Sequence, residues 1–73
     1  MLKALLLKYE AEIAAAQANI SVYLNNPVGI GEHPDLVAAV DSQLEAIAHA
    51  KDKIEVLEKY YGPLISKHEI IDY

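Results

Sequence analysis

The chain of 73 residues contains no cysteine, tryptophan, phenylalanine or arginine. Without cysteine, neither a disulfide nor a thiolate metal site can form. Six lysines are outnumbered by eleven carboxylates, and the formal net charge is −5, so the basic surface that binds a phosphate backbone is missing. The composition therefore excludes a disulfide-stapled domain and argues against a nucleic-acid-binding protein.

Long hydrophobic runs are also missing. The leucine run Leu5–Leu7 is ended by Lys8 and followed by Glu10 and Glu12. It is far shorter than the roughly 7–15 apolar residues of a signal peptide or the roughly 18 of a membrane span. The predicted helices carry both charge signs, so no basic face is available for a membrane surface. We expect a cytoplasmic protein with no membrane partner.

Residues 2–25 show the first strong pattern, because they contain neither glycine nor proline and their apolar residues alternate at spacings of four and three. This first seam consists of Leu2, Leu6, Tyr9, Ile13, Ala16, Ile20 and Tyr23. The spacing is that of a heptad and predicts a helix over 2–25. Asn25, Asn26 and Pro27 mark its end, since asparagine tolerates a left-handed C-cap and proline cannot continue a helix.

Residues 34–61 repeat the pattern. The second seam consists of Leu36, Val40, Gln43, Ile47, Ala50, Ile54, Leu57 and Tyr61, with Gln43 as its single polar member. Pro34 suits the first helical position, and Asp35 suits the positive end of the helix dipole. Gly62 and Pro63 predict the stop. Mostly polar residues opposite this seam indicate an ordinary one-sided amphipathic helix.

The two predicted helices are joined by a connector over residues 26–33, a length typical of antiparallel neighbours. Residues 64–73 form either a short C-terminal helix or an extended tail. We therefore predict one all-α domain over 1–73, an antiparallel two-helix hairpin. Because two helices of this size rarely close a core alone, the hairpin is expected to assemble into a homo-oligomeric helical bundle.

The helix over 2–25 has a second apolar face opposite its seam. This outward stripe consists of Ala4, Leu7, Ala11, Ala15, Ala18 and Val22. A single hairpin partner covers one side of the helix only, so the stripe is a candidate self-association interface where alanines let helix axes approach closely. The alternatives are that exposed alanines serve helix propensity alone, or that residues 64–73 cover part of the stripe.

The connector is the least generic segment. Gly29 and Gly31 precede His33 and Asp35 at the expected helix start, where backbone amides and the helix dipole favour an anion. One interpretation is a binding loop for an anionic metabolite or nucleotide. The other, which we favour, is a tightly specified turn in which the glycines adopt unusual backbone angles and neighbouring apolar side chains close the end of the bundle.

Neither catalysis nor metal binding is indicated. Glu45 and His49 are four residues apart, one too many for the Glu-x-x-His spacing of carboxylate-bridged metal bundles, and they point away from the seam. The serines have no recognisable histidine–carboxylate partners. We predict a protein with no catalytic residues, no metal and no cofactor.

The block from Tyr23 to Val37, Tyr-Leu-Asn-Asn-Pro-Val-Gly-Ile-Gly-Glu-His-Pro-Asp-Leu-Val, continues with Ala39 to Gln43. It resembles small uncharacterised proteins encoded by contractile-tailed phages of marine cyanobacteria and by related marine metagenomic sequences. The resemblance implies expression in the cytoplasm of an infected bacterium and an accessory role, such as binding a host protein. The first hypothesis is thus a non-enzymatic interaction protein that forms a dimer or tetramer, and the second is a small-ligand binder using Gly29–Asp35.

Overall fold

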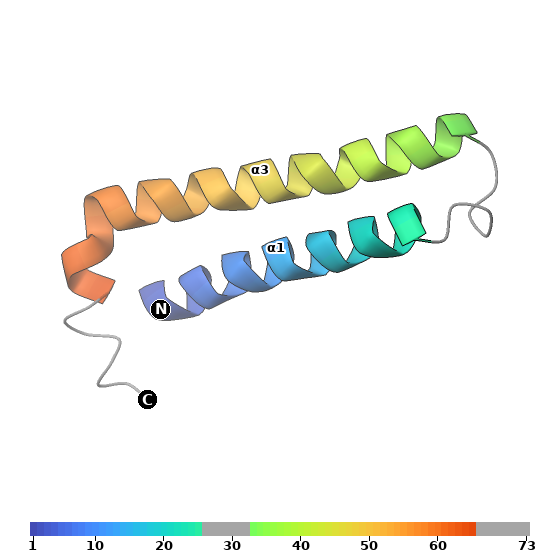
Figure 1. Cartoon of the computed structure of the whole chain (residues 1–73). Helices are drawn as coiled ribbons and strands as arrows, with labels where there is room; N and C mark the ends of the chain where they lie inside the picture. Colours follow the sequence, from blue (N-terminus) through green and yellow to red (C-terminus); the bar gives the residue numbers. More distant parts are fainter. Residues whose placement is uncertain (26–32, 66–73) are drawn as a thin grey trace.

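Two helices make up the fold. The computed structural model describes residues 1–25 and 33–65, and they form α1 (Leu2–Asn25) and α3 (His33–Leu64). The helices run antiparallel, side by side (Figure 1). The predicted all-α hairpin is confirmed. The bounds of α1 are those expected from its seam, and α3 begins one residue before the predicted Pro34.

The molecule is long and thin, with extents of 48 × 22 × 14 Å. Its radius of gyration is 16.0 Å, against about 11 Å for a compact domain of this length. It exposes 5429 Å² of surface, whereas a globular monomer of this mass exposes about 4,500 Å². A single hairpin of this shape has one internal contact surface and leaves most of each helix in solvent.

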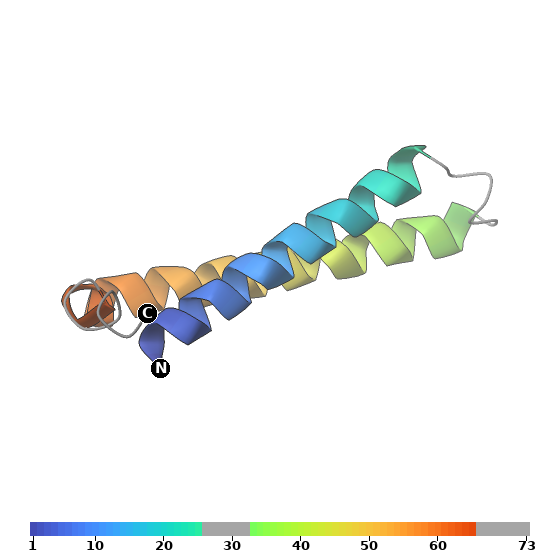
Figure 2. The same ribbon diagram turned by 90° about the horizontal axis from the view of Figure 1, so that it is seen from below.

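The two seams form that contact surface. Every member of the first seam is buried or half-buried, and so is every member of the second except Tyr61, which is 48% exposed. Ala16 and Ala50 are the most buried, at 3% and 2% exposure. The helix axes cross near their middles (Figure 2), and small side chains there let the two backbones approach closely.

The end of α3 differs from the prediction. The expected stop at Gly62 and Pro63 is wrong, because α3 continues through both residues to Leu64. A proline this near a helix end removes one backbone hydrogen bond, and burial of Ile65 at 9% exposure offsets that loss. The last turns bend toward the start of α1 (Figure 1), as expected where proline interrupts the hydrogen-bond ladder. Of the C-terminal segment predicted over 64–73, residues 66–73 lie outside the described residues.

Candidate interaction surfaces

The outward stripe of α1 lies on the side of the helix away from α3. All six of its residues are exposed, including Leu7 at 44% and Val22 at 56%. This follows from the geometry, since α3 packs on the opposite seam. None of the described residues covers the stripe, and its exposure extends along the length of α1.

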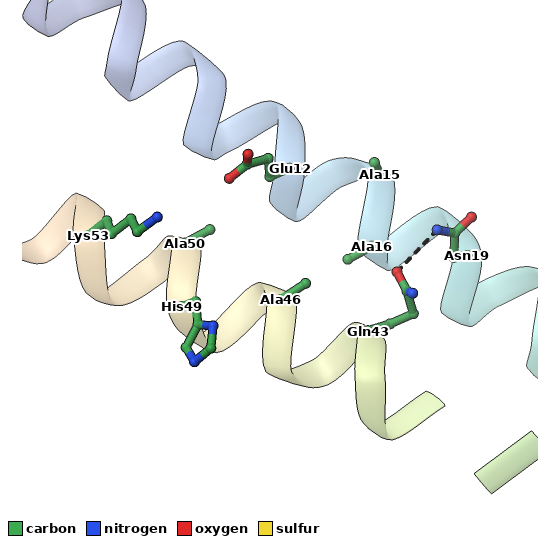
Figure 3. Close-up of a pocket in the computed structure, with 9 residues that line it drawn as sticks. All are labelled: Glu12, Ala15, Ala16, Asn19, Gln43, Ala46, His49, Ala50 and Lys53. Atoms are coloured by element: carbon green, nitrogen blue, oxygen red, sulfur yellow. Dashed lines mark hydrogen bonds between the residues drawn. The ribbon is translucent and has the colours of Figure 1, made fainter. Parts of the chain in front are cut away.

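A shallow central groove lies beside the helix crossing and encloses about 420 Å³ (Figure 3). It is lined by Glu12, Ala15, Ala16, Asn19, Gln43, Ala46, His49, Ala50 and Lys53. At one end the Asn19 Nδ2 donates a hydrogen bond of 3.1 Å to the Gln43 Oε1. Gln43, the single polar residue of the second seam, therefore has a hydrogen-bond partner on the flank of α1. The sequence pattern did not predict this pairing.

The charged side chains of the central groove make local pairs. The Lys8 Nζ lies 3.8 Å from the Glu12 Oε2, one turn away on α1. The Lys53 Nζ lies 5.4 Å from the centre of the Tyr9 ring, which brings α3 against the half-buried tyrosine of the first seam. Such exposed cation–π contacts contribute about 0.5–1 kcal/mol. The Lys53–Tyr9 contact joins the two helices, whereas the Lys8–Glu12 pair lies within α1.

No metal-binding arrangement occurs within residues 1–25 and 33–65, where no three histidine or carboxylate side chains come close enough to hold an ion. Glu45 and His49 are both exposed. The His49 ring points away from α1, although its residue borders the groove (Figure 3). Both side chains are on the outer part of α3, as their place relative to the seam predicted.

A second groove, missed by the sequence analysis, lies where α1 ends and α3 begins. This connector-end groove encloses about 390 Å³ and is lined by Leu24, Leu36, Val37, Val40, Asp41 and Leu44. Val37 is 69% exposed and Leu44 is 53% exposed, so the apolar surface of α3 extends beyond the seam onto one flank at this end. The sequence feature that could have revealed this groove is the spacing of Val37 and Leu44, which are two helical turns apart on one flank of the seam.

The four residues of the ligand-binding hypothesis are only partly placed. Gly29 and Gly31 lie outside the described residues, and of His33 only the backbone is described, as the first residue of α3. Asp35 is exposed in the first turn of that helix. The described side chains therefore supply one carboxylate here and no group that attracts an anion.

Comparison of the chain with protein-family models, with curated proteins and with solved structures gave no match. Neither α1 nor α3 combines the length and hydropathy that crossing a bilayer requires. The functional argument therefore rests on the surfaces of an elongated helical hairpin, namely the outward stripe and the two grooves.

Proposed function

We propose that the chain is a non-enzymatic interaction protein, which self-associates through the outward stripe of α1 and binds another protein. The supporting observation is that the hairpin leaves much of its apolar surface exposed. Among the residues that the structure describes, the buried apolar set is Ala16, Ala50, Leu57 and Ile65, two of them alanines. Single hydrophobic cores of this size rarely stabilise a chain without a staple, a metal or a partner.

The elongated chain has more exposed surface than a globular chain of the same mass. The hairpin exposes about 1,000 Å² more than a globular monomer of equal mass. Each side of a standard protein interface loses about 800 Å². The outward stripe supplies part of this area on a straight helix, and its four alanines permit close helix packing against a second copy. A bundle of at least four helices, with α1 central, would bury the stripe.

The biological setting of this proposal comes from the sequence block between Tyr23 and Gln43. Its resemblance to small phage-encoded proteins favours an accessory protein that acts in an infected bacterial cell on a host or phage protein. In an oligomer each subunit would contribute one copy of every exposed surface. Two linked binding sites bind a partner more tightly than one.

Self-association is tested by light scattering coupled to gel filtration over a hundredfold concentration range. We expect a mass at least twice the chain mass of 8.0 kDa. Ala11→Arg and Ala18→Arg place long cations in the middle of the stripe and should lower that mass, while arginine keeps the helix propensity high. Ser42→Arg, on the exposed outer side of α3, is the matched control and should leave the mass unchanged. A mass of 8.0 kDa at every concentration would contradict the proposal.

A further inference from the structure

The connector-end groove combines an apolar floor with an acidic surrounding. Leu24, Val37 and Leu44 are 66%, 69% and 53% exposed around it. In Figure 2 the two helix axes diverge from their crossing toward the end of α1 and the start of α3. A concave surface lined by aliphatic side chains from two helices is typical of a site that receives aliphatic side chains of a partner.

Charge is distributed unevenly along the hairpin. Between Lys8 and Lys51 the sequence contains no lysine or arginine. The same stretch contains six carboxylates: Asp35, Asp41 and Glu45 are on the first half of α3, Glu10 and Glu12 are on the first half of α1, and Glu32 lies outside the described residues. Asp41 lines the connector-end groove, and Asp35 and Glu45 are exposed on the same part of α3. This end of the hairpin is therefore negative, and it attracts cations over roughly a Debye length of about 8–10 Å.

We propose that the connector-end groove binds a basic amphipathic segment of a protein partner. Aliphatic side chains of that segment enter between Leu24 and Leu44, and its lysines or arginines lie beside Asp41 and Glu45. The inference rests on the proposed function and deepens it by naming the partner's chemistry. The groove shares no residue with the outward stripe.

A second copy of this chain is a poorer occupant. Symmetric pairing of two connector-end grooves would bring two negatively charged surfaces together, which is unfavourable. The lysines of the described residues, Lys3, Lys8, Lys51, Lys53 and Lys59, all lie toward the other end of the hairpin, interspersed with carboxylates. Charge complementarity therefore favours a basic partner over self-pairing at this site.

The test uses the full chain and a labelled model peptide of about four helical turns, composed of leucine at helical spacing and lysine elsewhere. A matched peptide has glutamate in place of lysine. We expect the lysine peptide to bind, measured by fluorescence anisotropy, and the glutamate peptide to bind at least about tenfold more weakly. Equal affinity for both peptides would overturn the proposed charge preference.

Leu44→Glu separates groove binding from diffuse charge attraction, because it adds negative charge while removing an apolar wall. We expect the Kd for the lysine peptide to rise about tenfold, which corresponds to loss of one well-packed aliphatic contact. Val56→Glu adds the same charge at a similarly exposed valine away from the groove and should change the Kd less than about twofold. If the Leu44→Glu chain binds the lysine peptide as tightly as wild type, or more tightly, the proposal that the groove is the binding site is overturned.

A second pair of variants tests the acidic rim. Asp41→Asn with Glu45→Gln should raise the Kd about threefold to tenfold and flatten its salt dependence, whereas Asp52→Asn with Glu55→Gln, with the same change of charge, should have the smaller effect.

Circular dichroism confirms folding of each variant, and Val37→Glu replaces Leu44→Glu if the latter unfolds. Light scattering distinguishes the two proposals: a lower mass for Leu44→Glu would assign the groove to a second copy and overturn the inference, whereas a loss of mass confined to Ala11→Arg concerns the stripe alone.

Discussion

The terminal end and the connector end of the hairpin are formed by the same two helices but bury their apolar residues differently. At the terminal end Leu57 and Ile65 are 7% and 9% exposed, although Tyr60 and Leu64 are 64% and 44% exposed there. At the connector end Leu24 and Val37 are 66% and 69% exposed. α3 has 32 residues against 24 in α1, and its last turns bend toward the start of α1 (Figure 1). The comparison indicates that the helices bury apolar side chains where they overlap at the terminal end and leave apolar side chains exposed where they diverge.

The largest expected effect is at Leu57, because its side chain is buried against α1 at the terminal end. Leu57→Ala should lower the free energy of unfolding by about 2–3 kcal/mol. Leu44→Ala removes the same atoms from the connector-end groove, where they are exposed, and should cost less than about 0.5 kcal/mol. Urea unfolding at one fixed protein concentration measures both, since association also contributes to stability. Equal losses would break the contrast between the two ends.

The helix crossing between the two ends should tolerate little added volume. Ala50→Leu inserts a large side chain at a residue 2% exposed and should destabilise by about 1–3 kcal/mol, because the helices must move apart. Ala48→Leu, at an exposed position two residues earlier, should be within about 0.5 kcal/mol of wild type. Thermal unfolding followed by circular dichroism checks this. A neutral Ala50→Leu would show that the helices are not in close contact there.

Gly62 tests whether α3 continues through the terminal end or stops there. A Cβ added at this residue would meet nothing within 4 Å. Gly62→Ala should therefore stabilise the hairpin by about 0.5–1 kcal/mol, the usual gain for replacing glycine inside a helix. If Gly62 instead ended the helix in a left-handed conformation, alanine would be destabilising. The sign of the shift in Tm distinguishes the two.

The smallest expected effect concerns the hydrogen bond from Asn19 to Gln43 beside the crossing. A double-mutant cycle with Asn19→Ala and Gln43→Ala should give a coupling of about 0.5 kcal/mol, near the lower limit for a hydrogen bond because both groups have access to water. The four unfolding free energies measure it directly. A coupling of zero would mean that Gln43 is solvated rather than paired.

Much of the fold was predictable from local patterns. The seam of 2–25 and the Asn-Asn-Pro sequence after it gave the bounds of α1, and the seam of 34–61 identified which residues of α3 face α1. The outward stripe was also predictable, because its exposure follows from having one partner helix. Gly62 and Pro63 misled the prediction, since their local preference to stop a helix was outweighed by burial of Ile65.

By itself, the sequence determined the two helices, the faces they turn toward each other and the negative charge between Lys8 and Lys51. These follow from the period of the helix and from the order of residues along the chain. Only the tertiary structure decided how far α3 extends, that Asn19 pairs with Gln43, and that Leu24 lies beside Val37 and Leu44 in one groove. Each of these depends on where two helices cross, which is set by packing between residues far apart in sequence.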